Sequence, residues 1–360
     1  MTKILTTQNV KQIIQTIGFE AYILGLIKYL EDDFKRWETF EKTPRIGFYR
    51  NQGVMELMPV CGDELFAFKY VNGHPNNTQI NQLTVLGVGL LAEVSTGIPL
   101  LISEMTLLTA LRTAATSTMA SKYLANKQIQ SFGIIGNGTQ SEFQTLAHQA
   151  IFNFKKVFYY DIDSKSMEKF RKNMEGEGFE LIACSSTKEV CDNAEILTTC
   201  TAAVGKQELV KVGWLRPGQH LNCIGGDSPD KTEIDPEILK KAKITVEYFE
   251  QTKLEGEIQN LGQEAKDYVA AELWEVLKGL KNVRKDFDDI TLYDSVGFAL
   301  EDYSVLRYTY DLACKFNIFT NLEMTPELDD CKNLYSKISQ KTNAHIGFDK
   351  VDHFKSRLGI

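Results

Sequence analysis

The stretch from Ser131 to Ser141 restricts the fold of this 360-residue chain more than any other feature. It reads SFGIIGNGTQS, so an apolar strand pattern runs into a glycine turn and a helical pattern follows. Gly136 can make the tight turn, and Gly138 lets the backbone approach a pyrophosphate held at the helix N-terminus. Ser141 stands where the dinucleotide-binding motif has Gly or Ala, and it is small enough for close helix packing. Taken alone, such a turn is weak evidence for a dinucleotide site.

The next strand pattern supports the same kind of site. Residues 156–161 read KVFYYD and end in Asp161, 20 residues after Ser141. This is where a dinucleotide-binding fold has its ribose-binding carboxylate. Such a carboxylate bonds the adenosine 2′-hydroxyl and repels a 2′-phosphate, and no arginine immediately follows Asp161, so the sequence predicts NAD rather than NADP as cofactor. The alternative is an ordinary glycine turn with a solvated aspartate at a strand end.

Two kinds of secondary-structure pattern divide the chain. Residues 45–104 carry short strand patterns separated by turns, which predict an antiparallel or mixed sheet. A long helix pattern at 105–125 follows, and from residue 131 strand and helix patterns alternate, which predicts a parallel sheet covered on both faces. A second long helix pattern at 297–315 leads to a polar tail. The predicted fold class is therefore α/β, with an α+β part ahead of the parallel sheet.

Composition and charge exclude several classes of function. Lys and Arg number 40 against 48 Asp and Glu, and no basic cluster stands out, so a nucleic-acid partner is not expected. The most apolar stretch, 83–102, is interrupted by polar and turn residues, and the N-terminus lacks a signal-peptide pattern, so no membrane partner is expected either. Seven dispersed cysteines favour buried thiols in the cytoplasm. The five histidines have no metal-ligand spacing, so no metal site is predicted.

Several longer motifs follow one another along the chain. Pro59 is followed by FKYVNGHP at 68–75, SEMTLLTALRTAAT at 103–116, IGNGTQSEFQ at 135–144 and GGDSPDKTE at 225–233. These motifs resemble the ornithine cyclodeaminase/μ-crystallin family and, within it, the bacterial ornithine cyclodeaminases. The resemblance runs from about residue 40 to Tyr308 and does not cover the tail after Asn321.

The resemblance implies a two-domain homodimer that uses NAD as a bound, recycled cofactor. Residues 1–112 with 318–360 would form an α+β substrate-binding and dimerisation domain. Residues 113–317 would form a Rossmann-type NAD-binding domain. The active site would lie between the two domains, and its substrate would be a small amino acid, L-ornithine.

Charged residues in the apolar first half are the candidate substrate ligands. Arg45, Lys69 and Arg112 each lie among apolar neighbours, and Glu56 lies in a similar stretch. The local pattern allows all four side chains to face solvent, because burying an unpaired charge is costly. The resemblance instead implies that the three cations bind the substrate α-carboxylate, where charge-assisted bonds would orient Cα. It places Glu56 near the substrate amines and makes Val296 a further substrate contact.

Asp227 follows an apolar strand pattern at a Gly-Gly turn. In a parallel sheet this is the carboxyl edge, where ligands bind, although aspartates also occupy such turns for structural reasons. The resemblance implies that Asp227 is the catalytic proton donor and acceptor. It also implies cofactor contacts at Thr84, Arg112, Gly136, Asn137, Gly138, Thr139, Gln140, Asp161, Thr201, Ile224, Gly225, Gly226, Lys231 and Ser295. Thr139 departs from the small residue common in relatives, and His74 is expected to be structural.

The implied reaction converts L-ornithine into L-proline and ammonia, within ornithine catabolism and proline biosynthesis. NAD+ takes hydride from Cα, the δ-amine attacks the imine, ammonia leaves and the hydride returns. Lysine and 2,4-diaminobutyrate are alternative substrates, because one methylene changes binding by only about 1–3 kcal/mol. The same motifs also allow an amino-acid dehydrogenase or cyclic ketimine reductase of the same family, and a non-catalytic binding protein like μ-crystallin. Glu56 and the Gly-Gly-Asp turn disfavour the dehydrogenase and the reductase, and Asp227 and Lys69 disfavour the binding protein.

Overall fold

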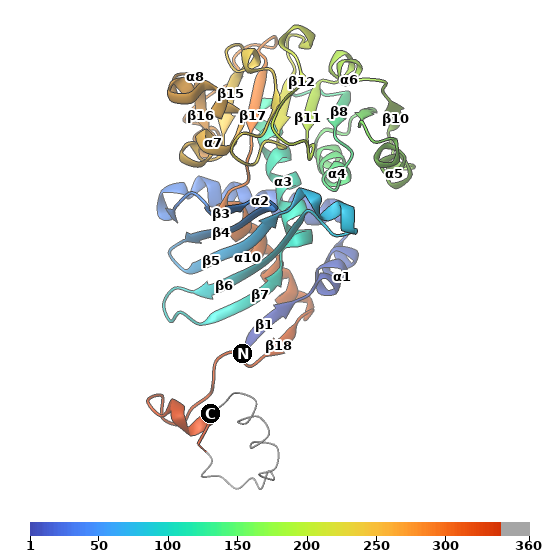
Figure 1. The fold of residues 1–360 in the computed structure, drawn as a ribbon. Coiled ribbons are helices and arrows are strands. Elements are labelled where there is room, and N and C mark those ends of the chain that lie inside the picture. Colours follow the sequence, from blue (N-terminus) through green and yellow to red (C-terminus); the bar gives the residue numbers. More distant parts are fainter. Residues whose placement is uncertain (340–360) are drawn as a thin grey trace.

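Two eight-stranded sheets organise the computed structural model, which describes residues 1–339 (Figure 1). The first sheet has the strand order β18-β1-β7-β6-β5-β4-β2, and β3 pairs with β4. Its strands are β1 Thr2–Leu5, β2 Glu41–Lys42, β3 Ile46–Arg50, β4 Gly53–Cys61, β5 Leu65–Gly73, β6 Val85–Glu93, β7 Pro99–Glu104 and β18 Thr320–Leu322. β1 and β7 are parallel and the other pairs antiparallel, so the predicted mixed sheet is confirmed.

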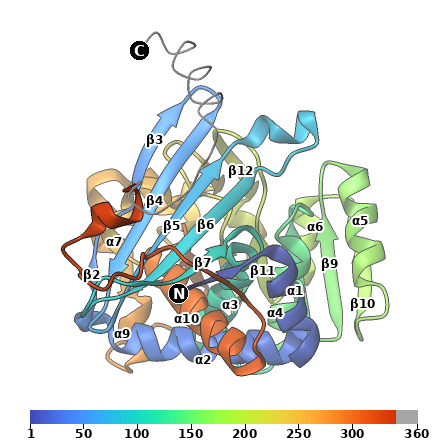
Figure 2. The same ribbon diagram turned by 90° about the horizontal axis from the view of Figure 1, so that it is seen from below.

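Helices pack along the first sheet and against one another (Figure 2). They are α1 Thr7–Ile17, α2 Phe19–Lys35 and α10 Ala299–Phe316. The Thr6 hydroxyl caps α1 by accepting from the Asn9 backbone N–H at 3.3 Å. Helix α10 packs on β4, β5 and β6 and on α2. Within the described residues no single helix is long and apolar enough to cross a membrane; α1 and α2 reach that length only together, with a 103° bend between them.

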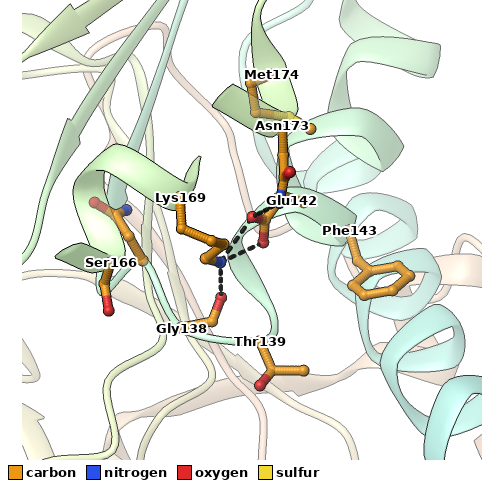
Figure 3. Close-up of a pocket in the computed structure, with 9 residues that line it drawn as sticks. Gly138, Thr139, Glu142, Phe143, Ser166, Lys169, Asn173 and Met174 are labelled. Carbon is orange, nitrogen blue, oxygen red and sulfur yellow. Dashed lines mark hydrogen bonds and ion pairs between the residues drawn. The ribbon is translucent and has the colours of Figure 1, made fainter. Parts of the chain in front are cut away.

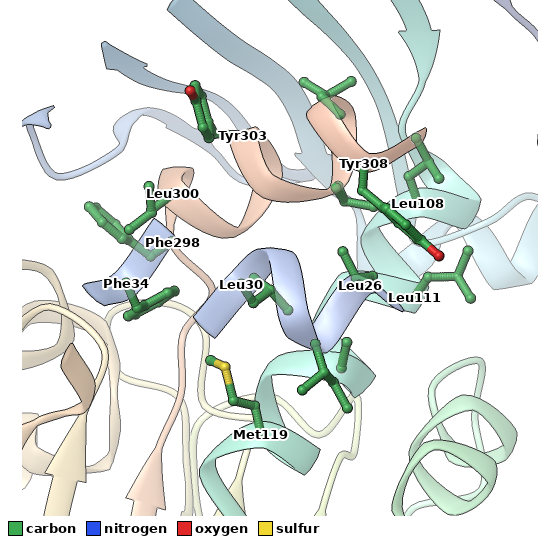
Figure 4. Packing of buried hydrophobic residues seen from close by; sticks show 14 of the residues in the cluster. Leu26, Leu30, Phe34, Leu108, Leu111, Met119, Phe298, Leu300, Tyr303 and Tyr308 are labelled. Atoms are coloured by element: carbon green, nitrogen blue, oxygen red, sulfur yellow. The ribbon is translucent and has the colours of Figure 1, made fainter. Parts of the chain in front are cut away.

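Helix α3 (Thr106–Leu124) connects the two sheets. It contacts β6 of the first sheet and β13 and β17 of the second, and it also packs on α2, α4 and α10. Most of its side chains are buried, which explains its apolar and small-residue composition. Figure 4 shows the core where α2, α3 and α10 meet, built from Leu26, Leu30, Phe34, Leu108, Leu111, Met119, Phe298, Leu300, Tyr303 and Tyr308.

The second sheet is entirely parallel, in the order β10-β9-β8-β11-β13-β17-β15-β16. Its strands are β8 Ser131–Ile135, β9 Lys156–Tyr160, β10 Glu180–Ala183, β11 Ile196–Thr199, β13 His220–Cys223, β15 Lys243–Val246, β16 Val269–Glu272 and β17 Thr291–Asp294. Its helices are α4 Ser141–Phe152, α5 Ser164–Met174, α6 Thr187–Asn193, α7 Phe249–Glu255, α8 Ala265–Tyr268 and α9 Leu273–Leu277. A separate pair is formed by β12 Lys206–Val210 and β14 Thr232–Ile234.

The parallel sheet confirms the predicted α/β class. Its first five strands in space follow the order 3-2-1-4-5 of a dinucleotide-binding fold, and the sixth place is taken by β17, the last strand of this sheet in the sequence. The predicted domain limits, 1–112 with 318–360 and 113–317, remain a proposal. Because α10 packs on the first sheet, we propose that this helix be counted with the first domain.

All seven cysteines are free, but Cys314 and Cys331 are exposed, so the expectation that the thiols are buried is wrong for these two.

Candidate functional site

The glycine turn after β8 has the geometry that its sequence predicts. Gly136 has a φ of 95°, and a Cβ there would lie 2.8 Å from the Cys200 carbonyl oxygen, so only glycine fits. A Cβ on Gly138 would meet nothing within 4 Å, so this side of the turn is open. The Ser141 side chain is buried and donates to the Gly138 carbonyl at 2.8 Å. Serine therefore fits the close-packed third position of the motif.

Asp161 lies beside this turn. Its carboxylate accepts from the backbone N–H of Asn137 at 2.6 Å and from that of Asp163 at 2.8 Å. The side-chain amide of Asn137 and Oε1 of Gln140 are buried and have no hydrogen-bond partner among the described residues. Open space beside a glycine, unpaired buried polar atoms and a nearby carboxylate suit the phosphates and ribose of a dinucleotide. The residues present therefore fit NAD.

A hollow of about 670 Å³ lies between α4 and α5, next to the glycine turn (Figure 3). Lys169 crosses it: its ammonium donates to the Gly138 carbonyl at 2.9 Å and pairs with Glu142 at 2.7 Å. Asn173 donates to the same carboxylate at 2.8 Å. These contacts fasten α5 to the turn. Sequence reasoning missed Lys169, because no local pattern marks a contact with Gly138, 31 residues away.

Most of the other predicted cofactor residues lie at the carboxyl edge of the same sheet. Thr201 follows β11, Ile224 to Gly226 follow β13, and Ser295 follows β17, and these strands are neighbours. Thr84 is different, because it precedes β6 of the first sheet, where its carbonyl accepts from the His74 backbone N–H at 2.8 Å. Among the described contacts, none joins Thr84 to the glycine turn.

Arg45 joins the two halves of the site. Its guanidinium lies 3.1 Å from the Glu56 carboxylate and 3.2 Å from that of Glu255. It also donates to the carbonyl of Val296 and, at 2.6 Å, to that of Gly297, both in the segment after β17. A residue just ahead of β3 thus binds the carboxyl edge of the second sheet. Burial opposes its charge, but the surrounding carboxylates outweigh burial and raise the pKa of Arg45.

Lys69 and Arg112 lie next to each other beneath α10. The Lys69 ammonium is 2.7 Å from Asp302, and Arg112 is 3.1 Å from Asp302 and 2.7 Å from Glu301. Gly297 allows Arg112 to approach, since a Cβ there would lie 2.6 Å from its guanidinium. Burial, together with the charge of Arg112, lowers the pKa of Lys69 to about 8.

The expectation that these charged residues could face solvent is therefore wrong for all four. The side chains of Arg45, Glu56, Lys69 and Arg112 are all at most 7% exposed. Each finds a partner of opposite charge, which removes the penalty of burying it alone.

Sequence reasoning missed four acids that complete this site: Glu247, Glu255, Glu301 and Asp302. Glu247 accepts from the Ser295 hydroxyl at 2.5 Å and from the Val296 backbone N–H at 3.0 Å. Burial raises the pKa of Glu255 to about 7, although Arg45 works against that rise. A signal did exist for two of them, since Glu301 and Asp302 interrupt the apolar start of a long helix pattern.

Asp227 lies at the rim of this charged region. Its side chain is 49% exposed and pairs with Lys231 at 2.9 Å. Gln259, in the 3-10 helix Glu257–Glu264, fastens the same turn by accepting from the Asp230 backbone N–H at 2.7 Å and donating to the Lys231 carbonyl at 3.2 Å. The charge of Asp227 also helps to raise the pKa of Glu255, after burial and Glu56.

Comparison with known proteins agrees with this arrangement. The model of the ornithine cyclodeaminase/mu-crystallin family matches residues 7–316. The chain belongs to this family. An ornithine cyclodeaminase of the family, from Brucella suis biovar 1 (strain 1330), is 44% identical over 334 residues, 93% of this chain and 92% of that protein.

Two solved structures extend the family comparison. An archaeal alanine dehydrogenase dimer with bound NAD is 32% identical, with a TM-score of 0.83 over 90% of this chain and 99% of that one. A lysine cyclodeaminase, described for its recognition of L-lysine, L-ornithine and L-2,4-diaminobutyric acid, is 25% identical, with a TM-score of 0.86 over 93% of this chain and 98% of that one. The resemblance seen in the sequence motifs is thus confirmed, and so is the fold class.

Proposed function

We propose that this protein is an NAD-dependent ornithine cyclodeaminase, which converts L-ornithine into L-proline and ammonia. The observation that carries the proposal is the meeting of buried cations and carboxylates beside a dinucleotide-binding edge. The ornithine cyclodeaminase relative at 44% identity over almost the whole chain supports the same activity.

The balance of buried charge suits a diamino acid. Three cations, Arg45, Lys69 and Arg112, would bind the α-carboxylate through charge-assisted hydrogen bonds. Carboxylates outnumber them, since Glu56, Glu247, Glu255, Glu301 and Asp302 are all buried. A substrate with one carboxylate and two ammonium groups brings the positive charge that this arrangement lacks. An alanine-type substrate brings one ammonium fewer.

The roles of the chain's own groups follow from their positions. NAD+, when bound, supplies the reversible removal of hydride from the substrate Cα. Asp227, held by Lys231 and partly exposed, would accept and return the proton of the reacting amine. Glu56 and Glu255 flank Arg45 and would hold the second amine within reach of Cα.

We further propose that the protein is a cytoplasmic homodimer. One face of the first sheet carries an exposed apolar row, Ile46, Leu57, Tyr70 and Val88, which are paired in register across β3 to β6 and are 39–49% exposed. A row of this kind is typical of a surface covered by a partner. The alanine dehydrogenase relative, described as a dimer, supports a second copy as that partner. Leu57→Glu should shift the protein from dimer to monomer in sedimentation, whereas the control Leu280→Glu, exposed on the second domain, should not.

The activity can be tested directly with purified protein. Substoichiometric NAD+ is added with L-ornithine, L-lysine or L-2,4-diaminobutyrate, and ammonia and the cyclic product are measured. The proposal expects many turnovers per NAD+ with ornithine and formation of proline. Ammonia release limited to one equivalent per NAD+, or a keto acid as product, would identify an amino-acid dehydrogenase instead.

A further inference from the structure

Three buried acids form a hydrogen-bonded chain beneath the carboxyl edge of the second sheet. Glu233 accepts from the Thr201 backbone N–H at 2.8 Å, and its own N–H donates to Glu257 at 2.7 Å. The Glu257 N–H donates in turn to Asp294 at 2.9 Å. All three side chains have 0% exposure. Among the described residues, none of the three forms an ion pair with a cation.

This chain of acids lies directly under two loops of the predicted cofactor edge. Glu233 binds Thr201 after β11, and a Cβ on Gly225, after β13, would lie 2.2 Å from its carboxylate oxygens. One of these oxygens, Oε2, is buried without a hydrogen-bond partner among the described residues. Asp161 marks the other end of the edge, across β8. In a fold with this strand order a bound dinucleotide would cross the edge from that end, and the loops after β11 and β13 would hold its nicotinamide half.

Acids buried without a cation are costly, because ionised carboxylates lose their hydration. Burial raises the pKa of Glu233, and burial with the charges of Asp294 and Glu233 raises that of Glu257 further. The charge of Lys231 acts on Glu233, but Lys231 pairs with Asp227. The raised pKa values mean that these acids hold their protons more readily, and a positive group over β11 and β13 would favour their ionised, negatively charged forms. The oxidised nicotinamide ring carries a positive charge, and the reduced ring is neutral.

We propose that the Glu233–Glu257–Asp294 chain makes the protein bind NAD+ more tightly than NADH. This inference rests on the proposed function. A cyclodeaminase ends each cycle with its cofactor oxidised, so a preference for NAD+ keeps the resting protein ready for the next substrate. Glu233 is the positioning residue. Its contacts with Thr201 and Gly225 place its carboxylate against the two loops.

Glu233→Gln separates this electrostatic role from a structural one. Glutamine keeps one carbonyl oxygen for Thr201 and changes only the unpartnered oxygen, so the loop geometry is preserved while the charge is lost. Dissociation constants for NAD+ and NADH are measured by calorimetry without substrate. The expected result is that the ratio of the NADH constant to the NAD+ constant falls on the order of tenfold in the variant. Glu257→Gln should lower the same ratio and serves as the second variant if the first does not fold.

The control is Glu104→Gln, which removes a half-buried carboxylate at the end of β7 in the first domain and should leave the ratio unchanged. An unchanged ratio in Glu233→Gln and Glu257→Gln, or equal weakening of both cofactors, would overturn the inference and leave a purely structural role. Failure of the parent protein to bind either cofactor would instead contradict the proposed function.

Discussion

The backbone N–H of Asn137 donates to the Asp161 carboxylate over 2.6 Å, which ties the end of β9 to the glycine turn after β8. The N–H of Asp163 holds the second carboxylate oxygen at 2.8 Å. Two backbone donors therefore hold this carboxylate in place beside the open face of Gly138. Its position is suited to the hydroxyls of a ribose and unsuited to a phosphate.

Asp161 should accordingly set the cofactor preference. NAD+ should support turnover at substoichiometric amounts, and NADP+ should be much poorer. Asp161→Ser combined with Ile162→Arg should shift the preference toward NADP+, since Ile162 is 91% exposed and an arginine there can reach a 2′-phosphate. Steady-state kinetics with both cofactors measures the change, with Ile162→Arg alone as control. Equal use of NAD+ and NADP+ by the parent protein would remove Asp161 from this role.

Lys69 should make carboxylate binding depend on pH. Its pKa is lowered to about 8 by burial and by Arg112, so the ammonium is charged below that pH and neutral above it. Binding of the product L-proline should therefore weaken as the pH rises through about 8. Lys69→Arg stays charged and should bind proline with little change over the same range. If both proteins show the same pH profile, Lys69 does not contact the carboxylate.

Asp227 should act in proton transfer and contribute little to the binding of NAD+ or ornithine. Asp227→Asn keeps the size of the side chain but cannot exchange a proton, so turnover should fall by on the order of 100-fold or more. Affinity for NAD+ and ornithine, measured by calorimetry, should change little. Asp230→Asn lies in the same exposed turn and is the matched control, expected to keep its activity. A fully active Asp227→Asn would move the role to another acid, with Glu56 and Glu255 as the nearest candidates.

Two buried histidines should make the second domain sensitive to acid. Burial lowers the pKa of His148 to about 4 and that of His220 to about 3, from 6.5. The unfolded chain takes up these protons below about pH 6.5 and the folded chain does not, so stability is full above 6.5 and falls as the pH drops toward 4. The loss is roughly 1.4 kcal/mol per pH unit for each histidine.

Urea unfolding between these pH values measures that slope. His148→Gln keeps a hydrogen-bonding side chain near Ser121 and Gln144 but cannot titrate, so its stability should fall less steeply with acid. Acids with raised pKa values, such as Asp294, change stability in the opposite sense and are common to both proteins. Parallel slopes for parent and variant would show that His148 titrates normally in the folded state.

Local sequence patterns were sufficient to predict most of the helices and strands. The strand predicted at 131–135 is β8 itself, and the helix predicted at 105–125 is α3. Two of the strands that escaped prediction are short and lack alternation: β16 reads VAAE, and the three residues of β18 are all exposed. β18 is a strand only because it pairs with β1 from the other end of the chain, and no local pattern encodes that pairing.

In the candidate site too, the sequence predicts contacts between residues close along the chain and does not predict contacts between distant ones. The glycine turn and Asp161 are close in sequence, so their spacing alone predicts their meeting. Arg112 and Glu301 are 189 residues apart, and their ion pair arises only when α3 and α10 pack together. The burial of the cations, and the identity of the acids that neutralise them, therefore depends on tertiary structure and could not be read from the flanking residues.

Recycling of the hydride is the central claim, and isotope labelling tests it most directly. L-ornithine deuterated at Cα is incubated with purified protein and substoichiometric NAD+, and the proline is examined by mass spectrometry and NMR while nicotinamide absorbance is followed. The account predicts that proline keeps the deuterium at Cα and that no NADH accumulates, because the hydride taken from Cα returns to the same carbon. Steady growth of NADH, or proline that has lost its label, would contradict it and identify a net dehydrogenase.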